Sequence, residues 1–264
     1  MTMELIRICE QVIATATETG RFILGEQAKF KETDVESKGI HNLVSYVDKT
    51  AEEKLVAALS KILPEAGFIT EEETVAQTRA EYNWIIDPLD GTTNFIHGLP
   101  CYAVSIALAK GDVPIVGVIY EVNRAECFYA WQGGGAFLNG KPIKVSSREK
   151  LDDSLLVTGF PYYDYGKLDQ YLALFKHLMQ NCRGVRRLGS AATDMAYVAC
   201  GRFEAFYEYG LSPWDVAAGI IIVQEAGGRV TDFSGGNEYL FGKEMICSNT
   251  QTHDQLLEAV RLFF

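Results

Sequence analysis

The segment WIIDPLDGTTNF, residues 84–95, ends an apolar run on two aspartates, Asp87 and Asp90. A strand over Trp84–Ile86 must leave its sheet at Pro88, because proline has no N–H to donate to a strand ladder. Both carboxylates then converge at the end of the strand, where ligands usually bind in α/β sheets. The segment therefore predicts a buried strand that ends at a binding site.

The charge of this segment indicates what it binds. Asp87 and Asp90 would raise each other's pKa unless a cation neutralised them, and a hard, oxygen-seeking ion such as Mg²⁺ suits them best. Gly91, Thr92 and Thr93 could open a short helix whose free N–H groups favour an anion. Aspartate and glycine are also common in turns and helix caps. A simple turn with a capping aspartate is therefore the alternative.

Two more acidic groups lie at the edges of apolar segments. Glu71 follows the strand-like run GFIT, and Asp215 opens the apolar run DVAAGIIIVQEAGG. A solvated acidic loop is the plain interpretation of Glu71, and an N-terminal helix cap is that of Asp215. Lys38 and Asp48 have similarly plain interpretations, a surface charge and a cap. These residues are candidates for the site only because Asp87 and Asp90 already suggest that a metal ion binds there.

Bulk composition describes an acidic chain with enough apolar residues to fold. With 264 residues, 48% of them hydrophobic, the chain can bury roughly 70–75% of its unfolded surface. Its net charge of −11 repels phosphate backbones and anionic membrane surfaces, so no nucleic-acid or membrane partner is expected. The six cysteines contain no Cys-x-x-Cys pair, and we expect them to be buried hydrophobes in a reducing compartment.

The N-terminal segment predicts an amphipathic helix. Leu5, Cys9, Val12 and Ala16 recur at helical spacing, and interspersed charges argue against a signal peptide. No window reaches the roughly 18 apolar residues that a membrane-spanning helix needs. A cytoplasmic location is expected.

The next 100 residues predict one more helix and a series of strands. Residues 29–49 are polar and charged and indicate a mobile loop or a loose hairpin. A helix is expected from Thr50, with Thr50 and Glu53 as its capping box, and Pro64 ends it. Strands are then predicted at GFITEEE, NWIIDP, YAVSIALAK, VPIVGVIYE and ECFYAWQ. The Asn-Gly pair in FLNGKPIKV indicates a tight antiparallel hairpin.

The second half alternates strands and helices, which implies sheets covered by helices. Its strands are expected near SLLVTGF, GVRRL, FEAFYEY and GRVTDF, and its helices over residues 167–180, from Ser190 and from Pro213. We expect a single domain over residues 1–264, with two structural halves of about 1–150 and 151–264. The boundary between them is expected near residues 145–153.

At this point the chain resembles the inositol monophosphatase family, a branch of the metal-dependent, lithium-sensitive phosphatases. The resemblance rests on WIIDPLDGTTNFIHGLP, the upstream EEE and the later WDVAAGIIIVQEAGG, in this order and spacing. It covers nearly the whole chain. It implies a layered α/β/α/β sandwich of the sugar-phosphatase type, commonly a homodimer, that binds two or three Mg²⁺ ions and hydrolyses small phosphate monoesters.

The resemblance also implies which residues hold the metal. Glu71, Asp87 and the carbonyl of Leu89 resemble the ligands of a first Mg²⁺. Asp87, Asp90 and Asp215 resemble those of a second. Glu71 also resembles a ligand of a weaker third ion and counts among the catalytic residues.

Further residues resemble the family's catalytic and substrate-binding positions. Thr92, paired with Asp48, looks like the dyad that orients or deprotonates the attacking water. Gly91 and Thr92 would offer backbone N–H groups to the phosphate, and Lys38 would approach the metal site when its loop closes. The positions that resemble contacts to inositol hydroxyls are Asp90, Gly189, Ser190, Ala191, Glu208 and Asp215.

Glu208 helps to choose among substrates. Its plain interpretation is an exposed strand carboxylate. In the family, a carboxylate here accepts hydrogen bonds from sugar-like hydroxyls, and such a site discriminates strongly against analogues that lack them. Two departures affect substrate detail: Thr70 stands where the family usually has glycine, and Ser212-Pro213 stand where animal members tend to have histidine and cysteine.

The expected reaction is the release of myo-inositol and phosphate from inositol 1-phosphate. No cysteine or histidine motif offers a covalent nucleophile, and metal ions roughly 3.5–4 Å apart can activate water and stabilise the leaving oxygen. The alternatives are a 3'(2'),5'-bisphosphate nucleotidase, a fructose-1,6-bisphosphatase or a histidinol-phosphatase. A non-catalytic metal-binding member of the family is a further alternative.

Overall fold

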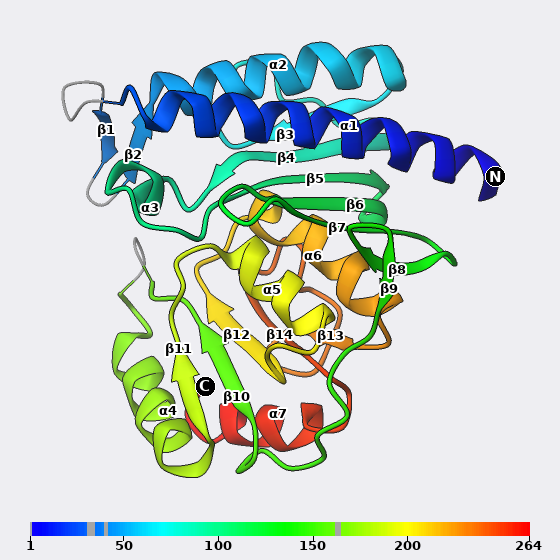
Figure 1. Cartoon of the computed structure of the whole chain (residues 1–264). Helices are drawn as coiled ribbons and strands as arrows, with labels where there is room; N and C mark the ends of the chain where they lie inside the picture. Colours follow the sequence, from blue (N-terminus) through cyan, green and yellow to red (C-terminus); the bar gives the residue numbers. More distant parts are fainter. Residues whose placement is uncertain (1, 31–34, 40–41, 162–164) are drawn as a thin grey trace.

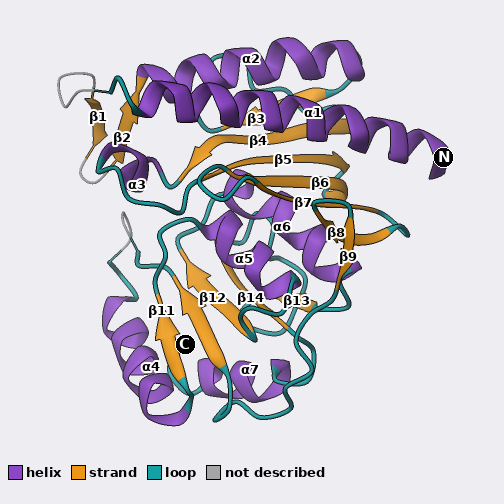
Figure 2. Ribbon diagram, viewed as in Figure 1, coloured by secondary structure: helices purple, strands orange, loops and turns teal. Residues whose placement is uncertain are grey.

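The computed structural model describes residues 2–30, 35–39, 42–161 and 165–264. Its helices and sheets stack in alternating layers, which Figure 2 shows by secondary structure. In order, the helical layers consist of α1 (Thr2–Gln27) with α2 (Tyr46–Ile62), then α5 (Ala191–Ala199) with α6 (Pro213–Glu225), then α4 (Leu168–Asn181) with α7 (His253–Arg261). The predicted layered α/β/α/β sandwich is confirmed, and α4 with α7 adds an outer helical layer.

The first sheet lies between α1/α2 and α5/α6 (Figure 1). Its strands follow the order β3 (Gly67–Thr70), β4 (Tyr82–Asp90), β5 (Ala103–Lys110), β6 (Val113–Glu121), β7 (Glu126–Trp131), β8 (Gly135–Leu138) and β9 (Lys141–Ile143). Only β3 and β4 pair in parallel. Asn139 and Gly140 join β8 to β9 with positive φ angles of 48° and 81°, as a tight hairpin turn requires. The predicted Asn-Gly hairpin is therefore confirmed.

The second sheet separates α5/α6 from α4/α7. Its strands follow the order β11 (Gly184–Arg186), β10 (Leu155–Thr158), β12 (Ala205–Tyr209), β14 (Glu244–Ser248) and β13 (Arg229–Thr231). β10 runs parallel to β11 and β12, whereas β14 runs antiparallel to both of its neighbours. The four predicted strands of this half are confirmed, but β14 and α7 were not predicted.

Helix α1 buries one face against the first sheet. Cys9, Val12, Ala16 and Ile23 are buried at intervals of three, four and seven residues, the spacing of one helical face. They share a core with buried residues of α2 and of strands β4 to β7. Within the described residues, no helix combines the length and the apolar character needed to cross a membrane.

Helix α2 begins earlier than predicted. Its N-cap is Ser45, whose side chain accepts a hydrogen bond from the Val47 N–H, and Asp48 reaches back to the Ser45 N–H at 2.8 Å. The capping box of Thr50 and Glu53 is therefore wrong, because the same pattern occurs one turn earlier and starts the helix first.

The predicted loose hairpin before α2 is present where the chain is described. Strands β1 (Val35–Gly39) and β2 (Asn42–Ser45) form an antiparallel ribbon. Part of the predicted loop, residues 31–34 and 40–41, lies outside the described residues.

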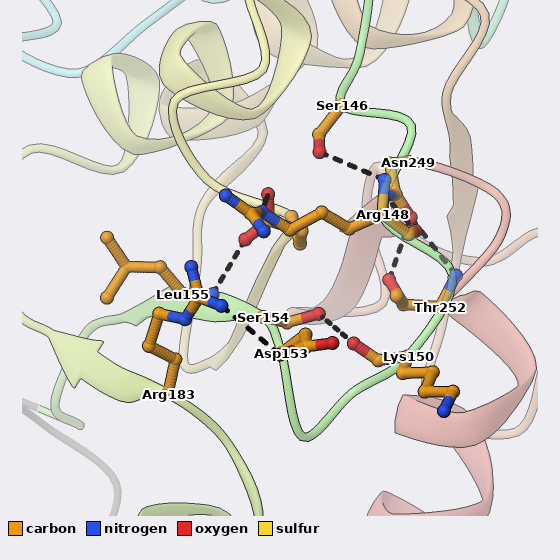
Figure 3. Close-up of polar contacts among 10 residues, drawn as sticks. Ser146, Arg148, Lys150, Asp153, Ser154, Leu155, Arg183, Asn249 and Thr252 are labelled. Carbon is orange, nitrogen blue, oxygen red and sulfur yellow. Dashed lines mark hydrogen bonds and ion pairs between the residues drawn. The ribbon is translucent and has the colours of Figure 1, made fainter.

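Residues 144–154 connect the two sheets and are tied to the second half (Figure 3). The buried carboxylate of Glu204 accepts a hydrogen bond from the Leu155 N–H at 2.6 Å and lies 3.2 Å from Arg148 Nε. The Asn249 side-chain amide donates to the Arg148 carbonyl at 2.9 Å. These contacts fix where the chain crosses from one sheet to the other.

Candidate active site

Strand β4 carries both aspartates of the opening segment, but it does not leave the sheet at Pro88 as predicted. β4 continues to Asp90, which pairs with Ala103 of β5 after a shift of register that begins at Asp87. A bulge of this kind accommodates a proline that cannot donate to the ladder. Within it, Asp87 Oδ1 accepts a hydrogen bond from the Leu89 N–H at 2.9 Å. The bulge therefore holds both carboxylates at the end of a rigid strand.

Glu71 reaches Asp87 because β3 and β4 are parallel and end side by side. The Glu71 N–H donates to the Ile86 carbonyl at 3.3 Å. The side chains of Glu71 and Asp87 line the same cavity. Burial and the surrounding negative charges, including Asp215, raise the pKa values of both carboxyl groups well above their ordinary range. Glu71 is partly buried and lines a cavity, so a fully solvated acidic loop does not describe it.

Asp90 joins the two halves of the chain. Its Oδ2 accepts hydrogen bonds from the Ser190 hydroxyl and the Ala192 N–H, both at 2.7 Å. Ser190 is the N-cap of α5, so the start of this helix is fixed against the end of β4. Burial raises the pKa of Asp90 to about 6, although these hydrogen bonds act in the opposite direction.

Asp215 lies in the first turn of α6 and serves as part of its cap. Its Oδ2 accepts a hydrogen bond from the Ser212 N–H at 2.7 Å. The cap predicted as its plain interpretation is therefore present, and Asp215 also lines the same cavity as Asp87 and Asp90. Burial, followed by the negative charge of Asp90, raises the pKa of Asp215 to about 7.

Thr92 and Asp48 are in direct contact, although 44 residues separate them in sequence. The Thr92 hydroxyl lies 2.8 Å from Asp48 Oδ1 and 2.9 Å from the Leu89 carbonyl, and its single proton can be donated to only one of them at a time. Asp48 is buried, which raises its pKa, and it also accepts hydrogen bonds from Ser45 as part of the α2 cap. One carboxylate therefore fixes both the start of α2 and the orientation of Thr92.

Gly91 allows the turn into the short helix α3 (Thr92–Ile96). Its φ of +94° lies in the left-handed region that disfavours residues with a Cβ. A Cβ here would also lie 3.0 Å from the Cys101 carbonyl and 3.1 Å from that of Gly189. A side chain at this position would therefore strain the turn and press on two backbone segments, of which Gly189 lines the cavity.

Glu208 is buried on β12, so its interpretation as an exposed strand carboxylate is wrong. Both faces of β12 are covered, by α5 on one side and by α4 and α7 on the other. Burial and the negative charges of Asp215 and Asp90 raise the pKa of Glu208 well above its ordinary range, although Arg187 opposes this. Its carboxylate packs directly against the Cα of Gly159.

These groups meet in one cavity of about 510 Å³. Of the predicted site residues, those lining it are Glu71, Asp87, Leu89, Asp90, Gly91, Thr92, Gly189, Ser190, Ala191, Glu208 and Asp215. Asp48 lies behind the wall and reaches the cavity through Thr92. Lys38 lies in β1, and its side chain is outside the described part of the structure.

Several wall residues were not predicted. Asp194 is buried one helical turn after Ser190, and its Oδ1 has no hydrogen-bond partner in the part of the chain that the structure describes. The Arg187 guanidinium lies 5.3 Å from the centre of the Phe160 ring. The only sequence signal for Asp194 was its helical spacing from Ser190. The only sequence signal for Arg187 was its proximity to Gly189.

The donors in this cavity suit a hard divalent cation. No group of three or more histidine, cysteine, aspartate or glutamate side chains in the described ranges forms a ready-made metal-ligand set. The available donors are nevertheless all oxygens, and four of them are carboxyl groups whose pKa values are raised, first by burial and in Glu71, Asp87 and Asp215 also by neighbouring carboxylates. A divalent cation would reverse that repulsion, and Mg²⁺ and Ca²⁺ both prefer such ligands. The residues present therefore fit a Mg²⁺ site.

Comparison with known proteins gives one consistent result. The model of the family described as inositol monophosphatase matches residues 5–262. An inositol-1-monophosphatase of Mesorhizobium japonicum is 40% identical over 95% of this chain and 94% of its own length. A Pseudomonas aeruginosa protein named Nus factor SuhB is 42% identical over 94% of each. The crystal structure of the extragenic suppressor protein suhB from Bartonella henselae matches with a TM-score of 0.90 and 39% identity, over 96% and 97% of the two chains.

Proposed function

The chain belongs to the inositol monophosphatase family, and we propose on that premise that it is a Mg²⁺-dependent phosphatase that hydrolyses inositol 1-phosphate to myo-inositol and phosphate. One observation carries the proposal. Four carboxyl groups, one directly after β3, two on β4 and one on α6, line the same cavity as a threonine whose hydroxyl contacts a buried aspartate. The family acts on small phosphate monoesters, and this set of groups suits their hydrolysis.

The metal would be held by residues from both halves of the chain. Its proposed ligands, for two or three ions, are Glu71, Asp87, the Leu89 carbonyl, Asp90 and Asp215. Bound Mg²⁺ supplies positive charge that lowers the pKa of water and stabilises the leaving oxygen. Asp90 accepts the hydrogen bonds from Ser190 and Ala192 with its Oδ2, and Asp215 accepts that from Ser212 with its Oδ2. The Oδ1 of each aspartate takes part in none of these bonds.

Thr92 and Asp48 would handle the proton of the attacking water. When the Thr92 hydroxyl donates to Asp48 Oδ1, the lone pairs of its oxygen are available to a water proton. As the water oxygen bonds to phosphorus, the bond from phosphorus to the inositol oxygen breaks, one water proton passes to Thr92 Oγ1, and the Thr92 proton passes to Asp48. The departing inositol oxygen takes up a proton from solvent water, which gives myo-inositol. Burial raises the pKa of Asp48, which makes this carboxylate a stronger base.

The second half would orient the substrate. Glu208 is the buried acceptor proposed for a ring hydroxyl, with Gly189, Ser190 and Ala191 on the adjoining wall. The N–H groups of Gly91 and Thr92 are proposed to contact the phosphate. Holding both ends of the substrate would align phosphorus with the attacking water, and such alignment accounts for much of the rate of enzymatic reactions.

A substrate panel tests this proposal against its rivals. Phosphate release would be measured with and without Mg²⁺ on inositol 1-phosphate, fructose 1,6-bisphosphate, histidinol phosphate and 3'-phosphoadenosine 5'-phosphate. We expect the highest kcat/KM on inositol 1-phosphate. Preference for another ester would assign the chain to a sister phosphatase, and absence of turnover on all of them would sink the enzymatic proposal.

Two further points belong to the same proposal. A relative of 42% identity carries the name Nus factor, so a chain that binds Mg²⁺ without turnover would favour a non-catalytic role. The predicted homodimer stays a prediction, which sedimentation velocity would check.

A further inference from the structure

The strongest unexplained contacts in the molecule lie beside the proposed metal site, around Glu52. Glu52 is fully buried in α2, where a lone carboxylate is costly unless hydrogen bonds satisfy it. It lies one helical turn after Asp48, which contacts Thr92. Nothing in the proposed chemistry uses Glu52, so its burial needs another explanation.

Among the described residues, the hydrogen bonds that the Glu52 carboxylate accepts from other segments come from the turn that carries Glu71. Its Oε1 accepts from the Thr70 hydroxyl at 2.9 Å, and from the Thr74 N–H and hydroxyl at 2.7 and 2.8 Å. Its Oε2 accepts from the Glu72 N–H at 2.7 Å. Glu71 therefore lies between Thr70 and Glu72, which both donate hydrogen bonds to the Glu52 carboxylate. Glu52 belongs to α2, the helix drawn above β3 in Figure 1.

The turn needs this support because its backbone is unusual. Glu73 has a φ of +53°, a left-handed conformation that residues other than glycine rarely adopt and that surrounding contacts must enforce. The edge of β3 is also held by a side chain, since the Gln77 amide accepts from the Thr70 N–H at 2.9 Å and donates to the Thr70 carbonyl at 3.2 Å. The Thr70 hydroxyl accepts a further bond from Gln77 at 3.0 Å.

We propose that Glu52 is a positioning residue of the metal site: by binding both sides of the Glu71 turn, it directs the Glu71 carboxylate toward Asp87 and sets the affinity for Mg²⁺. Thr70 is part of this clamp, so the hydroxyl that departs from the family's usual glycine has a role here. With Asp48 and Glu52 one turn apart, a single face of α2 holds both the water-activating dyad and the metal-ligand turn.

The test is Mg²⁺ binding measured by isothermal titration calorimetry without substrate, together with kcat over a range of Mg²⁺ concentrations. Glu52→Gln keeps the shape of the side chain but replaces one of its two accepting oxygens by an NH₂ group. That group cannot accept the hydrogen bonds that the Glu71 turn donates. Changes behind a metal ligand typically weaken metal binding about 10- to 100-fold. We expect the Mg²⁺ dissociation constant of Glu52→Gln to rise about 10-fold, while kcat at saturating Mg²⁺ stays within about threefold.

Three further variants separate positioning from folding. Glu53→Gln alters the exposed neighbour on the same helix and should leave the dissociation constant unchanged. Thr70→Val removes one of the hydroxyl groups that bind Glu52 and should raise the Mg²⁺ dissociation constant about threefold. This effect is smaller than that of Glu52→Gln, which alters the carboxylate itself. Thr70→Ser keeps the hydroxyl and should restore the wild-type value. If Glu52→Gln does not fold, the comparison of Thr70→Val with Thr70→Ser decides.

The inference rests on the proposed metal site, and the two fail in different ways. A wild-type chain that binds no Mg²⁺ contradicts the proposed function and overturns the inference with it. Normal wild-type binding that changes less than about twofold in Glu52→Gln and Thr70→Val overturns the inference alone, even if both variants melt at lower temperature.

Discussion

A methyl group added to Gly159 should disable recognition of the substrate's hydroxyls without affecting the fold. An ideal Cβ at this position would lie 2.1 Å from the carboxylate carbon and both oxygens of Glu208. Ordinary contact begins near 3.4 Å, so the carboxylate must move by about 1.3 Å. Because the atoms that clash belong to the end of a flexible side chain, the backbone can stay in place while Glu208 moves.

This displacement allows an estimate of the effect on catalysis. A buried hydrogen-bonding group left unpaired costs about 1–3 kcal/mol, which corresponds to about 5- to 150-fold in kcat/KM. Gly159→Ala should therefore lower kcat/KM for inositol 1-phosphate by that factor. It should leave kcat/KM for p-nitrophenyl phosphate, which has no ring hydroxyls, within about twofold.

The assay is steady-state phosphate release on both esters at saturating Mg²⁺. Gly25→Ala is the matched control, because its added Cβ meets no described atom within 4 Å apart from the backbone of its own helix. Glu208→Gln should resemble Gly159→Ala in its loss of selectivity. If the ratio of kcat/KM between the two esters is the same in Gly159→Ala and wild type, the placement of Glu208 against a substrate hydroxyl is wrong.

Three other perturbations test separate parts of the molecule. Thr92→Val removes the hydroxyl that contacts Asp48. We expect kcat to fall about 10²- to 10⁴-fold, while Mg²⁺ binding measured by calorimetry persists. A rate near that of the wild type would count against the dyad of Thr92 and Asp48. Mg²⁺ binding should release protons and strengthen from pH 6 to pH 8, because the raised pKa values of Asp90, about 6, and Asp215, about 7, let protons compete with the cation in acid. Titrations in two buffers of different ionisation enthalpy count these protons, and pH-independent affinity would contradict the competition. Glu204→Ala leaves the Leu155 N–H without its acceptor, so urea unfolding should show a loss of about 1–3 kcal/mol; an unchanged midpoint would mean that water replaces the carboxylate.

Local signals predicted much of the fold. Asn139-Gly140 specified a hairpin because few other pairs adopt two positive φ angles. The apolar run before Asp87 specified a buried strand. The predicted start of α2 was wrong because two similar capping patterns follow one another, at Ser45 and at Thr50. The first one caps the helix, and the contact of its Asp48 with Thr92 supports it further.

Elements and residues whose roles depend on distant parts of the chain could not be predicted from the local sequence. Strand β14 is short and pairs with β12 and β13 on either side, so its apolar residues gave no distinct pattern. Glu208 looked exposed because alternation along one strand does not reveal that helices cover both faces. No prediction was made for Glu52, since the donors that it binds lie 18 to 22 residues further along the chain.

The residues of the site were more predictable than its geometry. Residue types and a family resemblance were enough to select Glu71, Asp87, Asp90 and Asp215, and all of them line one cavity. The hydrogen bonds from Ser190 to Asp90 and from Thr92 to Asp48 required the folded arrangement of both halves.

The most direct test of Mg²⁺-dependent phosphatase activity is phosphate release from inositol 1-phosphate by the wild type and by Asp90→Asn, each with Mg²⁺ and with a chelator. We expect wild-type turnover only with Mg²⁺. Asp90→Asn should lose at least about 100-fold of it, since this aspartate is proposed to hold the metal and contact the substrate. Chelator-resistant wild-type turnover, or an Asp90→Asn rate near wild type, would contradict the account.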